Sequence, residues 1–312
     1  MIEDSTTEIY AITYAPFGPV SGLTYGNGLT ESRSYDQDYR LTGITVPAVL
    51  DWTLTDNADD DITAITDNLT SANNQALGYD VLNRPTTAAG NYGNQGFSYD
   101  ADGNRTQLNL GGVLTPYVYA AGSNRLTKVN TTSRSYDADG NTTHDGSYVY
   151  AYDNANRLAS ATKGANTDTY LYNALGQRVE KTVGATTTIF LYDESGHLIG
   201  EYTPSGGLIE ETVWLNARPI GVVTPTGLYY VTTDQLSAPR AITNANKQIV
   251  WQWSSDPFGN GAPTGSLVYN LKWYKGRVLK YQFPHFLDSV YFRHTHKEIR
   301  HQDGVNTYDD RA

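Results

Sequence analysis

The chain has 312 residues, a net charge of −11 and no cysteine. This length allows one large β domain or two ordinary domains, the lack of cysteine excludes a disulfide framework, and the acidic balance argues against a nucleic-acid partner for the main body. Tyrosine is unusually common, at 25 residues against 7 phenylalanines. Because a buried tyrosine hydroxyl needs a hydrogen-bond partner, we expect an interior that is aromatic and partly polar.

The first ten residues, MIEDSTTEIY, are acidic and polar, which is not the pattern of a secretory signal peptide. No apolar run approaches the roughly 18 residues of a transmembrane helix, so we predict no membrane span. The location stays open between the cytoplasm and secretion or surface display by a route without an N-terminal signal.

A seven-residue phrase, SYDADGN, occurs at 98–104 and again at 135–141, and its Tyr–Asp pair recurs with a period near 20. Self-similarity at a fixed period is typical of repeat architectures. The longest gap divides if LTDNADDDI is a degenerate copy with Thr55 in the tyrosine position. The tyrosines that mark the copies are Tyr35, Tyr79, Tyr99, Tyr119, Tyr136, Tyr152, Tyr172 and Tyr192.

Each copy reads as one β-hairpin. Aromatic residues alternate before the Asp, as in FSY at 97–99, with the two-residue period of a strand. A turn such as DADGN follows, and then a basic or polar residue with an aliphatic one restarts a strand, as in Arg157–Leu158 and Arg178–Val179. Successive hairpins are expected to pair edge to edge, since a single hairpin is marginally stable. With the tyrosines, the predicted structural residues are Asp36, Asp80, Asp100, Gly103, Asp137, Gly140, Asp153, Gly176, Asp193 and Gly196.

The two DADGN copies also resemble the start of an Asp-rich calcium loop. The glutamate expected at loop position 12 is replaced by Gly111 in one copy and Tyr148 in the other, and Asp-Gly is an ordinary hairpin turn. His294, His296 and His301 could suggest zinc, although alternate residues of a strand share a face in any case. We predict neither a metal nor another cofactor.

Catalytic motifs are missing from the sequence: there is no G-x-S-x-G, P-loop or H-E-x-x-H pattern. Asp256 of DPFG could be a hydrolytic acid, but a turn with proline at its second position explains the motif more simply. We predict no catalytic residue, and we expect that the protein is not an enzyme.

The motif Y-D-x-x-G-x-(R/L), spaced near 20 over residues 10–271, resembles the YD repeats of Rhs (rearrangement hotspot) proteins, teneurins and the C components of insect toxin complexes. The segments at 213–223, 228–243 and 249–260 are similar to the Rhs-associated core of that family. Thr232 and Ser237 stand where the family has His and Gly. The residues that carry the core-like motif are Asp234, Pro239, Arg240, Asp256, Pro257, Phe258 and Gly259.

The resemblance implies an all-β fold of repetitive antiparallel β-hairpins coiling into an open or partial YD-repeat shell, with an atypical C-terminal tail. We predict a YD-repeat region over 1–205, a core-like β region over 206–271 and a divergent tail over 272–312. The tail holds 8 Lys/Arg, 5 Asp/Glu and 4 of the 6 histidines. It is interpreted as a variable extension, a toxin remnant or the product of a disrupted reading frame.

Three functions follow as hypotheses. In the first, the chain is a structural shell fragment that encapsulates or presents a C-terminal or separate toxin passenger, or joins further Rhs shell segments. In the second, it is a surface module that binds carbohydrate or protein, with Trp251 and Trp253 on one strand face. The third is an enzyme, either a self-cleaving aspartyl protease or a tail toxin. Unpaired sheet edges also predict self-association.

Overall fold

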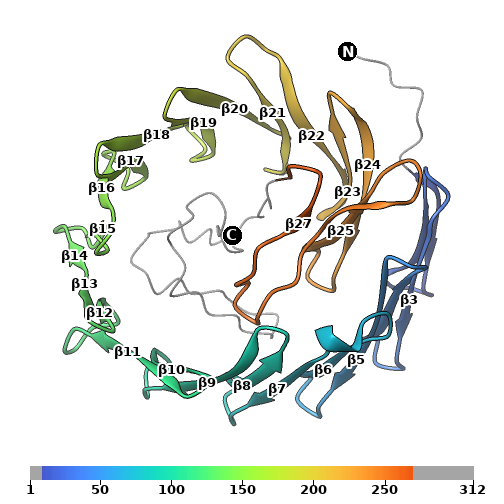
Figure 1. The fold of residues 1–312 in the computed structure, drawn as a ribbon, viewed down its shortest axis with the longest axis horizontal. Coiled ribbons are helices and arrows are strands. Elements are labelled where there is room, and N and C mark those ends of the chain that lie inside the picture. Colours follow the sequence, from blue (N-terminus) through green and yellow to red (C-terminus); the bar gives the residue numbers. More distant parts are fainter. Residues whose placement is uncertain (1–8, 270–312) are drawn as a thin grey trace. The chain divides into compact units, whose positions relative to one another are not determined.

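The computed structural model describes residues 9–269, which are almost entirely β-strand. The strands form two antiparallel sheets of 13 and 14 strands, and within each sheet every strand is hydrogen-bonded to its neighbours in chain order (Figure 1). A single 3-10 turn, η1, covers Ser71–Asn73. The prediction of an all-β fold made of repetitive antiparallel hairpins is therefore confirmed.

The first sheet contains β1 (Ile9–Tyr14), β2 (Val20–Tyr25), β3 (Thr30–Tyr35), β4 (Leu41–Val46), β5 (Leu50–Asp56), β6 (Ile62–Asp67), β7 (Gln75–Tyr79), β8 (Pro85–Gly90), β9 (Gly93–Tyr99), β10 (Arg105–Leu110), β11 (Val113–Tyr119), β12 (Leu126–Val129) and β13 (Thr132–Ser133). The second sheet contains β14 (Ser135–Tyr136), β15 (Thr142–His144), β16 (Val149–Tyr152), β17 (Leu158–Lys163), β18 (Asn166–Tyr172), β19 (Arg178–Val183), β20 (Thr186–Tyr192), β21 (Leu198–Tyr202), β22 (Leu208–Leu215), β23 (Arg218–Thr224), β24 (Gly227–Thr233), β25 (Pro239–Thr243), β26 (Ile249–Gln252) and β27 (Thr264–Gly265).

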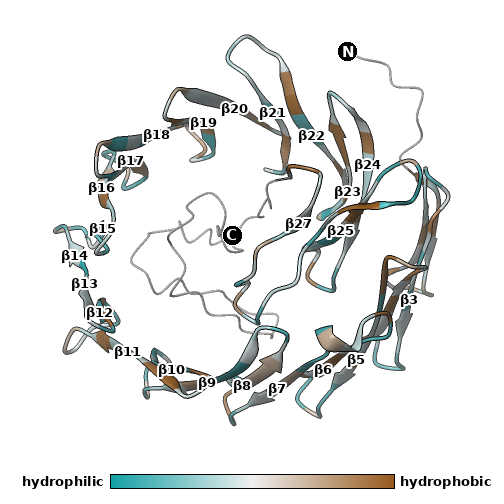
Figure 2. Ribbon diagram, viewed as in Figure 1, coloured by the Kyte–Doolittle hydropathy of each residue, from teal (hydrophilic) through white to brown (hydrophobic). Residues whose placement is uncertain are grey.

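Period-two alternation explains why these segments are strands. In β18, the Tyr170 side chain is buried, Leu171 is exposed and Tyr172 is half-buried, because successive side chains of a strand point to opposite faces. Figure 2 shows polar and apolar residues interspersed along the series of strands. In strands such as β18, one face thus carries aromatic rings and the other is in contact with solvent, whereas β23 and β24 are mostly buried on both faces.

The described residues divide into two compact units. Unit 1 comprises residues 9–94 and 210–269, and unit 2 comprises residues 95–209. The division at 205 and 271 that the sequence suggested stays a prediction, and residues 272–312 lie outside the described part of the chain. No helix within the described part is long and apolar enough to cross a membrane.

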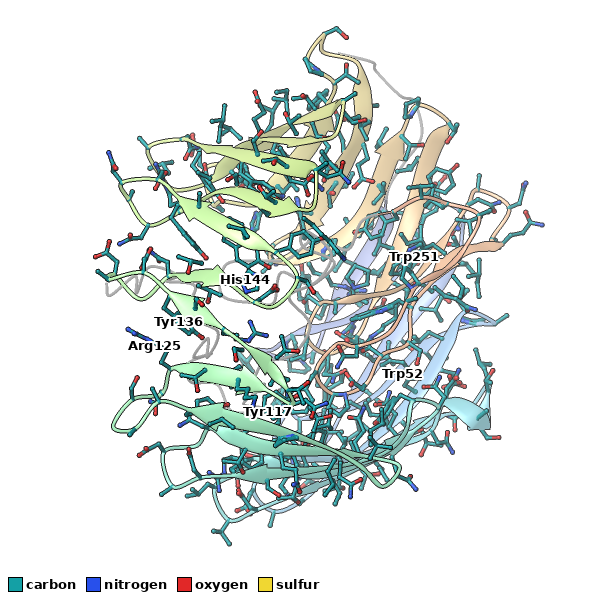
Figure 3. All side chains as sticks on the ribbon, turned by 60° about the vertical axis from the view of Figure 1, so that its left-hand side comes forward. Trp52, Tyr117, Arg125, Tyr136, His144 and Trp251 are labelled. Carbon is teal, nitrogen blue, oxygen red and sulfur yellow. The ribbon has the colours of Figure 1, made fainter. Side chains whose placement is uncertain are left out.

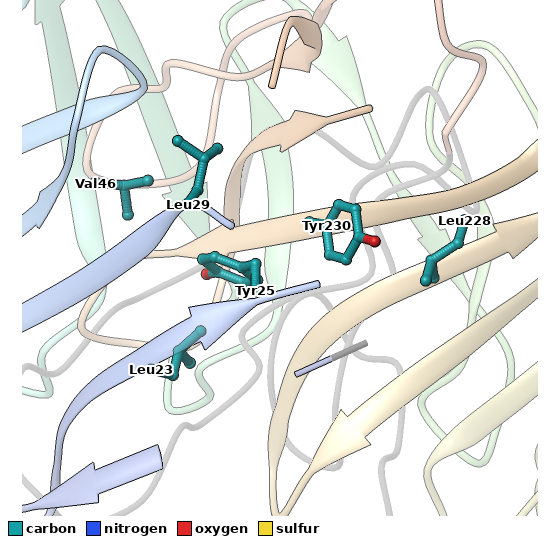
Figure 4. Packing of buried hydrophobic residues seen from close by; sticks show 6 residues of the cluster. All are labelled: Leu23, Tyr25, Leu29, Val46, Leu228 and Tyr230. Carbon is teal, nitrogen blue, oxygen red and sulfur yellow. The ribbon is translucent and has the colours of Figure 1, made fainter. Parts of the chain in front are cut away.

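Unit 1 brings together strands that are distant in the sequence. One hydrophobic cluster joins the early strands β2 and β4 to the late strand β24 (Figure 4). The rings of Tyr25 and Tyr230 meet edge to face, with centroids 6.1 Å apart. The buried members of the cluster are Leu23, Tyr25, Leu29, Val46, Leu228 and Tyr230.

Unit 2 packs locally. One cluster joins Tyr117 to Leu126 and Val129 on the next strand, and a second contains Tyr150, Leu158, Ala161 and Tyr170 from three consecutive strands. Every member of these clusters therefore finds its partners within about one repeat length, as expected for a repeat whose units contact only their neighbours.

Candidate functional site

The most frequent polar constellation of the molecule is the turn that begins at the repeat aspartate. At Asp36, Oδ1 accepts hydrogen bonds from the backbone N–H groups of Asp38 and Arg40, each at 2.9 Å. These bonds hold the pKa of the Asp36 carboxyl below its usual range, the one from Arg40 contributing most. In other copies Oδ1 of the first turn residue likewise accepts a hydrogen bond from the backbone N–H four residues later. These first residues are Asn57, Asp80, Asp100, Asp137, Asp153, Asn173, Asp193, Asp234, Asn244 and Asp256.

The second side-chain atom of the same residue binds the side chain four positions later. Asp36 accepts from Nε of Arg40 at 2.7 Å, and Asp193 lies 2.7 Å from Nδ1 of His197. Arginine is replaced by an amide in other copies, where the pairs are Asp100–Asn104, Asp137–Asn141, Asn173–Gln177 and Asp256–Asn260. In each of these turns the side chain of the first residue is thus hydrogen-bonded to the side chain of the fifth.

Two register assignments from the sequence are wrong. Asn57 accepts from the N–H groups of Asp59 and Asp61, so Asp56 holds the tyrosine position in this copy and Thr55 does not. In the copy at 172, Gln177 is the turn partner, and Arg178 falls in the following buried position. Both errors arose because a one-residue shift leaves the composition of a polar turn almost unchanged.

The fourth residue of the turn has a left-handed backbone, which favours glycine. Its φ is +87° at Gly103, and the predicted Gly140, Gly176 and Gly196, with Gly259 of the core-like motif, adopt similar values. The same conformation recurs in copies that have another residue at this position: Tyr39, Asp60, Asn83, Asn156, Ser237 and Lys247. The backbone of the turn therefore sets this conformation, and glycine only accommodates it.

The repeat tyrosine ends its strand and ties it to the strand before. The Tyr35 hydroxyl donates to the carbonyl of Val20, the first residue of β2, at 2.8 Å. Partial burial raises the pKa of half-buried members such as Tyr79 and Tyr119, so these hydroxyls remain protonated donors. The equivalent pairs are Tyr79 with Ile62, Tyr119 with Arg105, Tyr136 with Leu126, Tyr152 with Thr142, and Tyr192 with Arg178.

The other two predicted tyrosines lie at the same place in the ladder. Tyr99 faces Arg105 across the β9–β10 pair. Tyr172 faces Arg178 across the β18–β19 pair, and the guanidinium of Arg157 lies 5.3 Å from its ring centroid.

The core-like motif uses the same turn chemistry, which the sequence did not reveal. Asp234 is buried, and its Oδ1 accepts from the N–H groups of Leu236 and Ala238 while Oδ2 accepts from Nε of Arg240 at 2.8 Å. Pro239 begins β25 directly opposite Thr233. The motif is therefore a further copy of the repeat turn, in which the arginine that binds the aspartate lies six residues after it and not four.

The guanidinium of Arg240 is held between two indoles. It lies 4.5 Å from the Trp253 ring and 5.6 Å from the Trp52 ring. The DPFG turn follows: Asp256 accepts from the N–H groups of Phe258 and Asn260, and Pro257 sits second in the turn. All of these bonds are used to hold the local fold, so Asp256 acts as a turn former in this structure.

A buried ionic network in unit 1 was missed by sequence reasoning. The Glu31 carboxylate accepts from Nε of Arg33 at 2.6 Å, from Nη2 of Arg218 and from the Tyr25 hydroxyl at 2.9 Å. Arg218 also donates through Nε to the Thr233 hydroxyl at 2.8 Å. The only available signal was the charged pair Glu31 and Arg33 at alternate positions of one strand.

This network fixes the charge of Glu31. Burial alone would raise the pKa of its carboxyl, but Arg218 and Arg33 outweigh that effect and lower it. The carboxylate is therefore ionised and fully partnered, which describes a structural ion pair and not a general acid.

The remaining candidate sites do not assemble. Within residues 9–269, no three His, Cys, Asp or Glu side chains come together as metal ligands. The carboxylates of Asp100 and Asp137 are used by Asn104 and Asn141 of their own turns. His294, His296 and His301 lie outside the described residues.

Comparison with solved structures shows where this fold occurs. The Tc holotoxin pore of Photorhabdus luminescens matches with a TM-score of 0.69 at 16% identity, over 84% of this chain and 16% of that one. A TcdB2–TccC3 complex matches with a TM-score of 0.67 at 16% identity, over 83% and 16% of the two chains. At such identities the likeness establishes the fold alone.

A curated relative shares a shorter stretch. The tRNA nuclease WapA of Bacillus subtilis (strain 168) is 37% identical over 86 residues, which are 26% of this chain and 4% of that protein. The chain thus spans only a small part of the proteins it resembles. The model of the teneurin YD-shell family matches residues 68–266, more than half of the chain. The resemblance seen in the repeats is confirmed, and the chain belongs to the teneurin YD-shell family.

Proposed function

We propose that this chain is a wall segment of a YD shell that, with further shell segments, encloses or presents a polypeptide passenger and performs no catalysis of its own. One observation carries the proposal. In six copies the tyrosine that ends a repeat strand donates its hydroxyl to the carbonyl that begins an earlier strand, which is the preceding strand in five of them. These hairpins are therefore joined to their neighbours by a side chain as well as by the backbone ladder.

Such a wall gains its strength by repetition. A single hydrogen bond contributes about 0.5–1.5 kcal/mol net, and the self-closed turns add similar bonds in every copy. Where each hairpin contacts only its neighbours, as in unit 2, these contributions sum along the chain. Within each of the two sheets every strand is hydrogen-bonded to its neighbours, and a wall built in this way would hinder a protease from reaching an enclosed segment.

The similar proteins favour a passenger without identifying one. The Tc structures are described as a holotoxin pore and as TcdB2–TccC3 complexes, and WapA is named a tRNA nuclease. These names fit a shell that accompanies a toxic activity. The occupied carboxylates of the turns support a structural part for this chain.

The carbohydrate-binding alternative gains no specific support. Trp251 and Trp253, the pair that could have stacked on a sugar, are 2% and 4% exposed. Neither indole therefore offers a free ring face.

A protection assay tests the proposal. An unfolded reporter peptide is fused after residue 312, and its cleavage by a non-specific protease is compared with the same peptide on an unrelated all-β carrier of equal size. We expect cleavage to be slower by about tenfold or more on this chain, in whatever assembly it forms. Equal cleavage rates would contradict a shielding function. Intact mass after storage tests the absence of self-cleavage.

A further inference from the structure

Arg178 is an anomaly in the repeat. The residue that faces the repeat tyrosine in the ladder is leucine in neighbouring copies, where Tyr119, Tyr152 and Tyr192 face Leu126, Leu158 and Leu198. At Tyr172 this position is occupied by Arg178. Arg178 is 6% exposed, so a cation is buried at a position that leucine occupies in these three copies.

The surroundings of Arg178 hold the guanidinium, but within residues 9–269 its charge has no ion-pair partner. The Tyr170 and Phe190 rings lie 5.7 and 4.7 Å from it. Nε is buried without a hydrogen-bond partner among the described residues. Within residues 9–269 the two terminal amino groups have no hydrogen bond, and neither is among the buried unpartnered atoms, so the outer end of the guanidinium keeps some contact with solvent.

Nearby charges do not compensate for this burial. Burial lowers the pKa of Arg178, and the nearby hydroxyls of Tyr192, Tyr172 and Tyr170, followed by the carboxylate of Glu201, offset that effect only in part. Lys181, three residues along β19 and opposite Tyr170, has its pKa lowered by burial and by Arg178 itself. A buried cation, Arg178, and a half-buried one, Lys181, therefore share one face of β19 beside two aromatic rings.

Arg105 provides a matched comparison inside the same unit. It occupies the equivalent position opposite Tyr99, and its guanidinium lies 4.6 Å from the ring of Tyr117 on the following strand. Here Nη2 donates to the Tyr117 hydroxyl at 3.0 Å. At Arg178 the equivalent ring is Phe190, which has no hydroxyl. The chain thus supplies an internal acceptor at one site and omits it at the other.

We infer that the tip of Arg178, flanked by Phe190 and Tyr170 and supported by Lys181, is a binding site for a carboxylate side chain of an acidic polypeptide segment. The planar guanidinium offers two terminal amino groups to the two oxygens of a carboxylate. A sugar is a poorer fit, because Tyr170 and Phe190 are 3% and 4% exposed and leave no ring face for stacking. Naming the occupant a passenger rests on the proposed function; the carboxylate site does not.

The test measures binding of a glutamate-rich peptide to the full chain by calorimetry at physiological salt, with a lysine-rich peptide and an oligogalacturonate as comparison probes. Because the chain carries a net charge of −11, general attraction to a polyanion is disfavoured. We expect saturable binding of the glutamate-rich peptide only. Arg178→Leu, which restores the leucine of other copies, should weaken it by about tenfold or more, a change of about 1.4 kcal/mol.

Two further variants keep the test decisive if Arg178→Leu does not fold. Phe190→Tyr should supply the acceptor seen at Arg105, weakening peptide binding several-fold and raising the melting temperature. Arg178→Lys should keep the charge but lose the paired geometry, and bind with intermediate affinity. Arg125→Gln is the charge-matched control, since Arg125 is exposed beside the Tyr136 ring at 5.2 Å (Figure 3), and should stay within twofold of the unmodified chain.

Several outcomes would overturn the site. They are unchanged affinity in Arg178→Leu or Phe190→Tyr, an equal loss in Arg125→Gln, equal binding of the lysine-rich peptide, or binding of the oligogalacturonate that depends on Arg178. Absence of peptide binding to the unmodified chain also refutes it. None of these results alters the protease-protection assay, so failure of this site and failure of the shell function are distinguishable.

Discussion

In unit 1 the Tyr25 hydroxyl also lies within hydrogen-bond distance of the carbonyl of Val231, 206 residues later in the chain, whereas in unit 2 Tyr150 bonds to Asp145, five residues away. The two units use the same hairpin and the same turn. They differ in the distance along the sequence over which buried partners meet. The comparison indicates that local repeats are enough to form a sheet. In unit 1 the late strand β24 also packs against the early strands β2 and β4.

The largest expected effect is on the long-range network of unit 1. Arg218→Met should lower the free energy of unfolding by about 4 kcal/mol, because breaking a buried ion pair leaves Glu31 with one fewer cation. Urea denaturation measures the change. Arg40→Met, which removes a surface ion pair at Asp36, should lower the free energy of unfolding far less, because solvent screens an exposed ion pair. Equal losses in both variants would refute the distinction.

The next effect separates local from long-range packing. Leu126→Ala in unit 2 and Leu23→Ala in unit 1 should each cost about 3 kcal/mol through the cavity left behind. Hydrogen exchange should show lost protection only around β11–β13 for Leu126→Ala. For Leu23→Ala the loss should reach β24, which packs on the same cluster. A loss confined to β1–β3 in the second variant would argue against the shared core.

The third prediction concerns acid. Because the folded-state pKa of Glu31 lies below its unfolded value, its contribution is complete above the unfolded pKa of about 4.3 and is lost as the pH falls through the folded value. Stability should therefore decline below about pH 4 in the unmodified chain. In Glu31→Gln this part of the decline should be missing, as pH-dependent chemical denaturation would show. Parallel curves for the two proteins would exclude the ion pair as its source.

A smaller effect should be the same in both units. Tyr35→Phe in unit 1 and Tyr152→Phe in unit 2 each remove one hydroxyl that donates to a carbonyl of the preceding strand, Val20 and Thr142 respectively. Each should cost about 1 kcal/mol, measured by thermal unfolding. A loss in one unit alone would mean that this bond is not an independent local contribution.

The smallest effects concern the left-handed turn position. Lys247 has a φ of +65°, so Lys247→Gly should stabilise the chain by about 0.5–1 kcal/mol. At Gly103 a Cβ atom would meet nothing within 4 Å, and Gly103→Ala should destabilise by a similar amount through backbone strain alone. Calorimetry should show a higher melting temperature for Lys247→Gly and a lower one for Gly103→Ala. Shifts of the same sign in both variants would contradict a shared left-handed conformation at the two positions.

Sequence reasoning was strongest where the interactions are local. Alternating aromatics and an Asp followed by a tight turn identified the strands and the turn of copies such as 98–104 and 135–141. The predicted register was wrong by one residue at Asn57 and Gln177, because several polar residues of a turn can accept or donate equally well. It also treated Asp234 as part of a separate motif, although Asp234 forms the same turn as Asp36.

The sequence by itself determined the repeating hairpin, because the strand period, the turn and its side-chain bonds all lie within about 20 residues. Only the tertiary structure decided which late strands cover the early ones. The partner of Glu31 is Arg218, 187 residues away, and the burial of Arg178 between Tyr170 and Phe190 depends on two neighbouring strands. Pairings of that kind follow from how the strands pack, and no local pattern specifies them.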